Sequence, residues 1–205
     1  MPSRAELKEA SLQRILTASA ARLRAEGLSG AAIAPVMQEA GLTHGAFYAH
    51  FSNKDDLAVA AFRFALQDNR PRWMGAARSE SWPERLKRLA RRYLTTAHRD
   101  NLPDSCALAA LAADAARGSS GFKQAYAEEL NISLRAICNS PDESSPLDPA
   151  RFDEAIAFMA LCAGGIALAR AVDDAAFSEQ ILAACRQAAG RIATPEAPSP
   201  LGDAQ

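Results

Sequence analysis

Apolar residues recur every three to four positions along most of this chain. In the first such stretch Leu12, Ile15 and Leu23 share one helical face, charged residues take the opposite face, and Gly27 follows. This spacing fits an α-helix and not a strand, whose side chains alternate between two faces. It predicts a helix over about residues 6–26. Alanine dominates the apolar residues and β-branched residues are scarce, so composition also favours an all-α fold.

Shorter segments follow this helix. Apolar residues at helical spacing over residues 33–40 predict a second helix, and Gly41 then supplies the residue best suited to a positive φ in a tight turn. A third, very short helix is predicted to begin at Thr43 as its N-cap, with Phe47 and Phe51 facing inward. Ser52 is predicted to open the next helix. We therefore expect residues 1–54 to form a head of helix-turn-helix type.

A larger helical body is predicted over residues 55–193. Ser81 and Glu84 have the spacing of a capping box, with Pro83 in the first turn, and so predict a helix start. Further helices are predicted over residues 106–116, 122–138, 149–172 and 175–192. The Pro-containing segment 139–149 is predicted to be a loop. Residues 194–205 are expected to be a disordered tail.

Charge is distributed unevenly although the formal net charge of the 205 residues is only −1. Residues 1–100 carry a net charge of +6 and residues 101–205 carry −7. The basic half is therefore the candidate for contact with a polyanion, although uneven surface charge alone would also produce this pattern. The hydrophobic share of 49% excludes the class of disordered chains with low hydrophobicity.

The four cysteines are spread singly, without a C-x-x-C spacing, and no secretory signal precedes the first helix. They are expected to be reduced and mostly buried in a cytoplasmic protein. A redox role for Cys106 is the alternative, but no Lys, Arg or His lies beside it in the sequence to activate its thiol. The uncharged stretch 155–169 is shorter than a bilayer span requires, so no membrane contact is expected.

The segment 41–57 separates apolar and polar side chains on one short helix. Phe47 and Phe51 are its anchors, whereas His44, Tyr48 and His50 project from it. Small or hydrogen-bonding residues at a recognition helix's start let it approach base edges in the major groove. The candidate DNA-contacting residues are Thr43, His44, Gly45 and Ala46 for base edges, and Tyr48, His50 and Lys54 for phosphates. Packing roles for Tyr48 and His50, and a merely solvated Lys54, are the alternatives.

This segment resembles the signature of the tetracycline-repressor family, in Gly41-Leu-Thr, in Gly45-Ala-Phe-Tyr-Ala-His-Phe51, and in Lys54 and Leu57. The resemblance covers about residues 10–60. It implies a homodimeric transcription regulator, a repressor that a small-molecule ligand releases from a palindromic operator in double-stranded DNA. It also implies that the seven residues named above contact DNA. One departure is Ala31 and Ala32, where the family has Ser or Thr opening the second helix, with Ser29 or Gly30 as substitutes for the cap.

By the same resemblance the body should bind the effector and dimerise. The candidate pocket residues are Trp82, Tyr93, His98, Cys106, Phe122, Tyr126, Met159 and Cys162, with Trp73 in the same aromatic set. Ordinary core packing is the alternative for each of them. The helix over residues 149–172 is apolar nearly all round and needs two surfaces to pack against, so it is the candidate dimer helix unless both faces pack internally. The candidate dimer residues are Phe158, Leu161, Gly165, Leu168, Ile181 and Cys185.

Two other classes of function fit the sequence less well. A helical enzyme would need clustered nucleophiles, acids or metal ligands, yet the three histidines at 44, 50 and 98 lack metal-ligand spacing. No catalytic residue, cofactor or metal is therefore expected. A helical adaptor that binds protein would leave His44, Tyr48 and Lys54 without a role. The identity of the effector and of the operator is left open by the sequence.

Overall fold

The computed structural model describes residues 3–76, 79–139 and 147–193, and within these ranges the chain is helical and has no strand. Its elements are α1 (Arg4–Glu26), η1 (Gly27–Ala31), α2 (Ile33–Glu39), η2 (His44–Ala49), α3 (Lys54–Met74), α4 (Trp82–Tyr93), α5 (Thr96–Asp100), η3 (Leu102–Asp104), α6 (Ala107–Arg117), α7 (Ser120–Ile137), α8 (Pro149–Ala171) and α9 (Ala175–Ala189), where η marks a 3₁₀ helix. The all-α prediction is confirmed. The tail 194–205 and most of the loop predicted over 139–149 lie outside the described residues.

The first helix begins and ends at local sequence signals. At its start Ser3 and Glu6 form a capping box, in which each side chain accepts a hydrogen bond from the other residue's backbone amide. At its end Gly27 has a φ of +69°, a value that side chains with a Cβ disfavour. The end at residue 26 is as predicted, and the start lies two residues earlier.

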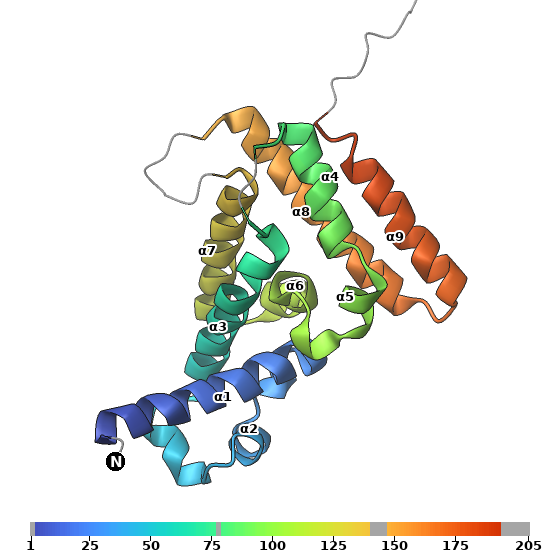
Figure 1. The fold of residues 1–205 in the computed structure, drawn as a ribbon. Helices are drawn as coiled ribbons and strands as arrows, with labels where there is room; N and C mark the ends of the chain where they lie inside the picture. Colours follow the sequence, from blue (N-terminus) through green and yellow to red (C-terminus); the bar gives the residue numbers. More distant parts are fainter. Residues whose placement is uncertain (1–2, 77–78, 140–146, 194–205) are drawn as a thin grey trace, which may run out of the picture.

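The head is built from the first half of α1 with α2, η2 and the start of α3. A small separate core holds it together, in which Ile15, Val36, Phe47 and Leu57 are fully buried. Gly41 makes the turn between α2 and η2 with a φ of +66°, as its type predicts. Figure 1 shows this head at one end of the molecule, with α1 lying across it.

Two predicted caps in the head are wrong. Ser52 does not cap α3; the N-cap is Asn53, whose Oδ1 accepts a hydrogen bond from the Asp56 amide at 2.9 Å because its backbone is extended there. Ser29 does not cap α2 either, since its hydroxyl turns back to donate to the carbonyl of Glu26 at 2.6 Å. The N-cap of α2 is Ala32, whose side chain cannot accept a hydrogen bond.

The second core fills the body and reaches into the head through α1 and α3. On α3, Leu57 belongs to the head core and Ala58, the next residue, to the body core. On α1, Leu23 packs into the body core, and buried Arg24 donates to the Pro103 carbonyl at 2.6 Å. Two helices are thus shared between head and body, so the division at residue 54 remains a proposal about folding units.

Besides α1, the longer helices α3 (Lys54–Met74), α4, α6, α7, α8 and α9 contribute to the body core. Ser81 and Glu84 form the predicted capping box at the start of α4. The antiparallel helices α8 and α9 lie side by side with α4 next to them, while α3, α6 and α7 lie on the other side of α8 (Figure 1). The short elements η1, α5 and η3 were not predicted, because segments of three to five residues carry too few positions to show a period.

The apolar helix α8 is long and apolar enough to cross a membrane if judged by length and composition alone. A core helix of a soluble protein passes the same test, and α8 packs against α4, α6, α7 and α9. Its hydropathy is therefore weak evidence for a membrane span.

Candidate nucleic-acid interface and body cavity

The short helix η2 has one buried and one exposed side. Phe47 has no solvent exposure and its ring lies 5.7 Å from that of Phe51, which is also buried. The prediction that these two phenylalanines anchor the segment is confirmed. Because η2 is a 3₁₀ helix and not an α-helix, its six residues are wound more tightly than an α-helix, with about three residues per turn.

The exposed side of η2 carries the polar residues that the sequence singled out. Thr43, His44 and Gly45 are exposed, and Tyr48 has 63% of its surface accessible. The His44 and Tyr48 rings meet edge to face, with their centroids 5.9 Å apart. A Cβ added to Gly45 would have no described atom within 4 Å, so this glycine faces open space. Ala46 is half-buried against the head core.

His50 is tied to the first helix. The Ser11 hydroxyl donates to the Lys8 carbonyl at 2.7 Å, so its oxygen remains free to accept from His50 Nε2 at 2.8 Å. Partial burial, followed by the positive charge of Lys8, lowers the pKa of His50 below its usual value, while Glu9 acts in the opposite direction. The neutral ring therefore donates its single N–H to the Ser11 hydroxyl.

Lys54 is the first residue of α3 and is exposed. The helix N-terminus beside it offers free backbone amides. Asp55 and Asp56 follow in the same turn and are also exposed, so the local charge is not uniformly positive.

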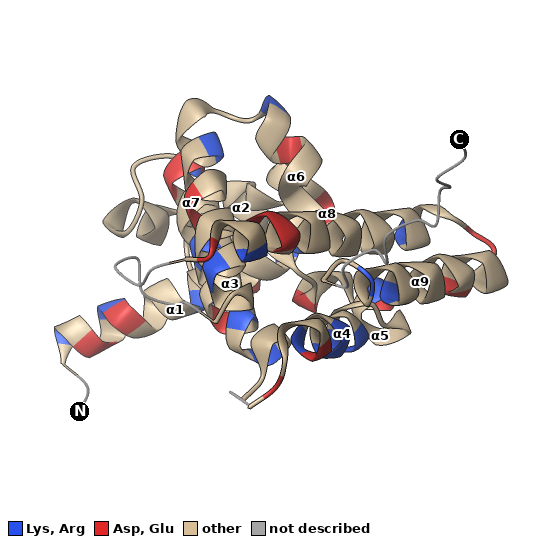
Figure 2. Ribbon diagram, turned by 90° about the horizontal axis from the view of Figure 1, so that it is seen from above, with Lys and Arg blue, Asp and Glu red and all other residues tan. Residues whose placement is uncertain are grey.

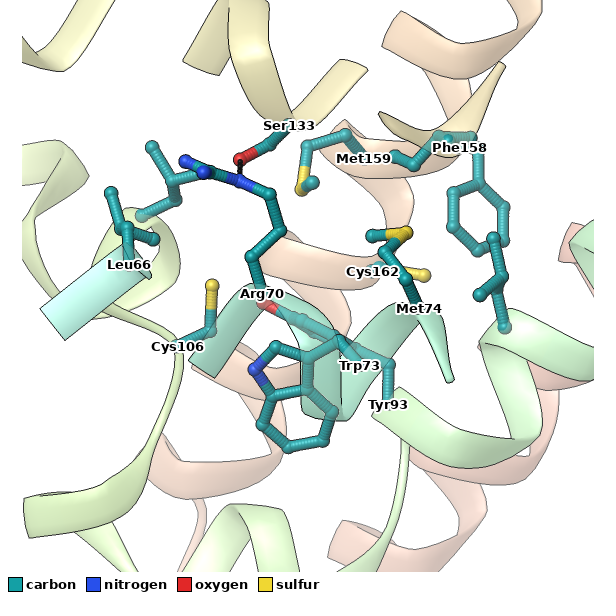
Figure 3. Close-up of a pocket in the computed structure, with 13 residues that line it drawn as sticks. Leu66, Arg70, Trp73, Met74, Tyr93, Cys106, Ser133, Phe158, Met159 and Cys162 are labelled. Atoms are coloured by element: carbon teal, nitrogen blue, oxygen red, sulfur yellow. Dashed lines mark hydrogen bonds between the residues drawn. The ribbon is translucent and has the colours of Figure 1, made fainter. Parts of the chain in front are cut away.

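A small cavity lies in the body between α3, α4, α7 and α8, with the start of α6 on one side. Its free volume is about 30 Å³, enough for about two water-sized groups. The cavity is lined by Leu66, Arg70, Trp73, Met74, Leu89, Tyr93, Cys106, Leu108, Ser133, Ile137, Phe158, Met159 and Cys162 (Figure 3). The lining is apolar and rich in sulfur apart from a few polar groups.

Four of the eight candidate pocket residues line this cavity, namely Tyr93, Cys106, Met159 and Cys162, and so does Trp73 from the same aromatic set. The other four lie elsewhere, each for a specific reason. The indole of Trp82 donates to Glu154 on α8. His98 lies behind Trp73 and Tyr93, with ring centroids 4.3 and 4.5 Å away.

Phe122 and Tyr126 are also outside the cavity lining. Their rings pack against that of Phe62, with centroid separations of 5.2 and 5.6 Å. The Tyr126 hydroxyl donates to the Leu108 carbonyl at 2.7 Å. Both residues therefore belong to the contact between α3, α6 and α7, and their assignment to the pocket is corrected.

The contribution of α3 to the cavity was not predicted from the sequence. Leu66, Arg70 and Trp73 are spaced as one helical stripe that continues the buried face of this helix. Arg70 on that stripe was the available signal, because a charged residue on a buried face must find a buried partner. It pairs with Glu129, which is 4% exposed, and its Nε donates to the Ser133 hydroxyl at 3.2 Å.

The cysteines in the described residues are all reduced. Burial raises the pKa of the Cys162 thiol well above its usual value, and the pKa of Cys185 also rises for the same reason. A thiol with a raised pKa is a poor nucleophile. No group of three His, Cys, Asp or Glu side chains suited to a metal ion occurs in the described part of the chain.

The outer face of α8 and α9 is apolar and exposed. Figure 2 shows long stretches of both helices without charged residues, in contrast to α4. Leu168 is 61% exposed and Phe177 is 52% exposed, and Leu161 and Ile181 are half-buried beside them. A Cβ at Gly164 would meet no described atom within 4 Å.

The other three candidate dimer residues, Phe158, Gly165 and Cys185, make their contacts within the body of their own chain instead. Phe158 is 4% exposed and lines the cavity. A Cβ added to Gly165 would stand 2.7 Å from the sulfur of Cys185, so this glycine is where α8 approaches α9 within one chain. Cys185 accordingly contacts α8 of its own chain. The sequence analysis placed Phe158 and Gly165 on the wrong face because α8 is apolar nearly all round and gives no signal of its rotation.

Comparison with known proteins assigns residues 15–61 to the family described as bacterial regulatory proteins, tetR family. Similar solved structures include TetR regulators from Chloroflexus aurantiacus (20% identity, 88% of this chain and 94% of that chain covered, TM-score 0.69) and Cytophaga hutchinsonii (20%, 92% and 96%, 0.67). A third, from Legionella pneumophila, has 17% identity, coverages of 92% and 98%, and a TM-score of 0.66. No curated protein matches the sequence.

Proposed function

Since this chain is a member of the tetR family of bacterial regulatory proteins by its N-terminal domain and by its fold, we propose that it represses transcription from an operator until a small molecule occupies its body cavity. The observation that carries the proposal is the exposed flank of η2. Thr43, His44 and Gly45 stand clear of the protein there, while Phe47 holds the other side in the core.

This flank suits the edges of base pairs in a major groove. Thr43 and His44 can donate or accept hydrogen bonds, and the open space at Gly45 allows the backbone to approach the bases. Ala46 is small and apolar enough to meet a thymine methyl group. These four residues are the proposed base readers.

Phosphate contacts are proposed for three residues beside this flank. The Tyr48 hydroxyl is exposed, and Lys54 adds a positive charge at the start of α3. His50 can serve only through the ring nitrogen that Ser11 does not occupy. Such contacts position a protein on the duplex without reading its sequence.

Dimerisation is proposed through the outer face of α8 and α9. Leu161, Leu168 and Ile181 are kept from the sequence analysis, and Gly164 and Phe177 join them. An uncharged apolar surface of this kind, made of two adjacent helices, suits an isologous contact with the same surface of a second copy. A two-fold dimer would place its heads on a palindromic operator with half-sites about 34 to 36 Å apart, or a multiple of that spacing.

Helix α3 connects the body cavity with the proposed DNA-binding surface. Its last turns supply Arg70, Trp73 and Met74 to the cavity wall, and its first residue is Lys54. A ligand that favours a different position of α3 would change the spacing of the heads and weaken operator binding. Because α1 also runs from head to body, the two helices would move together.

The family and the fold favour a regulator over the other classes considered. A regulator of this family is a soluble protein that acts on DNA, and we propose a cytoplasmic location, where the operator and reduced thiols are found. The protein-binding adaptor has no support from the family or the fold. Membership of the family also implies a regulator without enzymatic activity.

Selection of bound fragments from random DNA with the purified protein tests this function. We expect a palindromic consensus. His44→Ala should change the preferred base at one or two positions in each half-site, because a base contact carries sequence information. Lys54→Ala should weaken binding about equally for all sequences and lower the salt slope by about one. Failure of every duplex to bind at low ionic strength would refute the proposal.

A further inference from the structure

The cavity wall contains two polar groups whose hydrogen bonds are not made. The Tyr93 hydroxyl and the Trp73 indole nitrogen are both buried, and neither has a hydrogen-bond partner among the described residues. Tyr93 is 6% exposed, and its hydroxyl faces the thiol of Cys106, which is only a weak acceptor. Figure 3 shows the Tyr93 hydroxyl directed between Arg70 and Cys106, with the indole nitrogen of Trp73 on the side facing Cys106.

Both groups are donors. An indole N–H can only donate. Burial raises the pKa of Tyr93 well above its usual value, so the hydroxyl keeps its proton. A thiol is a weak acceptor and does not compensate for the loss of water around a buried hydroxyl. Among the described residues, no oxygen or nitrogen of the wall therefore accepts a hydrogen bond from these two donors.

Arg70, the charged residue among the described residues of the lining, is already neutralised. Arg70 pairs with Glu129, which is buried on α7, and with the Ser133 hydroxyl. An anion would have to compete with Glu129 for Arg70, and a cation would meet Arg70 without a free carboxylate. The remaining surface, from Met74, Met159 and Cys162 among others, is apolar and adaptable.

From these observations we propose that the cavity binds an uncharged, mainly apolar molecule that carries a hydrogen-bond-accepting oxygen, such as a ketone, ester or ether oxygen placed against Tyr93 and Trp73. This inference rests on the proposed function, because it names the class of effector for the same cavity. The free volume is about 30 Å³, so the methionine side chains must rotate to admit a ring. Met74 and Met159 are unbranched and suited to that movement.

The test uses three probes of similar size on the full-length protein labelled with ¹⁵N. Cyclohexanone carries the acceptor oxygen, methylenecyclohexane replaces that oxygen with a CH₂ group, and cyclohexanecarboxylate adds a negative charge. The readout is the indole N–H signal of Trp73. Trp82 is the other tryptophan of the chain and serves as an internal control, since its indole is already bound to Glu154.

We expect cyclohexanone to shift the Trp73 signal saturably and to leave that of Trp82 in place. It should bind on the order of ten times more tightly than methylenecyclohexane, because only the ketone satisfies the buried donors. Tyr93→Phe should bring that ratio close to one. This variant should fold, since the hydroxyl it removes contacts only the weakly accepting thiol of Cys106. Tyr126→Phe, which removes a hydroxyl outside the cavity, should leave the ratio unchanged.

Equal or tighter binding of the hydrocarbon or the carboxylate would overturn the inference, as would the absence of a saturable Trp73 shift with the ketone. Operator affinity is measured separately on the unlabelled protein without a probe. Loss of DNA binding there would refute the proposed function and leave the probe ratios intact. Operator binding without a preference for the ketone would support the proposed function and refute the proposed class of ligand.

Discussion

At His50 the hydrogen bonds within the head limit the proposed phosphate contact. The neutral ring of His50 donates through Nε2 to Ser11, whose own proton goes to the Lys8 carbonyl. The other ring nitrogen then carries a lone pair, which a phosphate oxygen repels. Only a protonated ring has a second N–H to donate.

Operator affinity is therefore expected to increase as the pH falls. Phosphate contact would raise the pKa of His50 in the complex above its lowered value in the free protein, so binding would take up as much as one proton per head. Affinity should rise as pH falls through the pKa of the complex and level off below that of the free protein. Fluorescence anisotropy from pH 5 to 8 measures this.

Ser11→Ala provides the matched comparison for the His50 prediction. Without the hydroxyl, the single N–H of the neutral ring can turn to the phosphate, and the pH dependence should weaken. An unchanged slope in Ser11→Ala, or the same slope in His50→Asn, would show that another group titrates. His44→Ala checks the exposed histidine in the same way.

His98 behaves differently because it is buried and fully bonded in its neutral form. Its Nδ1 donates to the Tyr93 carbonyl at 2.7 Å, and its Nε2 accepts from the Cys106 amide at 3.0 Å. Burial is the main cause that lowers its pKa from 6.5 to about 4. The unfolded chain thus binds a proton more readily, and stability should fall as pH drops from 6.5 to 4, by roughly 3 kcal/mol.

Urea unfolding at several pH values checks the His98 prediction. His98→Gln keeps a polar side chain of similar length and removes the titration, so its stability should depend less on pH in that window. The same pH dependence in the variant would assign the effect to other groups.

At the scale of the elements, helix α2 lacks a side chain that caps its N-terminus. Its N-cap is Ala32, in an extended conformation that would suit a capping side chain. Ala32→Ser should supply the missing acceptor and stabilise the protein by about 1 kcal/mol. Ala34→Ser, two residues later and exposed on the same helix, is the control and should be neutral or slightly destabilising. Denaturant midpoints decide between them, and a gain in Ala34→Ser alone would contradict the cap argument.

For the whole molecule, substitutions at the two adjacent glycines of α8 are expected to have different effects. Gly165 faces Cys185 of its own chain, so a larger residue there should destabilise the fold. Gly164 faces open space on the proposed dimer surface. Gly164→Arg should yield folded monomers with weak operator affinity, because a charge would be buried at the contact.

Light scattering with operator titration measures the effect of Gly164→Arg. Gly121→Arg is the matched control, since a Cβ at that helical glycine also meets no described atom within 4 Å and lies on α7. An intact dimer in Gly164→Arg would show that the interface lies on another surface of the body.

Features that depend on neighbours along the chain could be predicted from the amino-acid sequence. The helical period, the end of α1 at Gly27, the Gly41 turn and the inward Phe47 and Phe51 all follow from local geometry and from the contrast between apolar and polar faces. Local competition between caps was harder to predict, because Ser52 and Asn53 are both good N-cap residues and only the backbone conformation selects one.

The rotation of the body helices about their axes, and the space that they enclose, depend on packing between elements. The apolar surface of α8 extends almost all round it, so its sequence is compatible with several rotations, and packing against α9 and α4 places Phe158 and Gly165 inside and Leu168 outside. The cavity combines side chains from helices far apart in the sequence, and the unpaired donors of Trp73 and Tyr93 exist only because those helices exclude other partners there. Such contacts depend on distances between elements, which periodicity within one element does not contain.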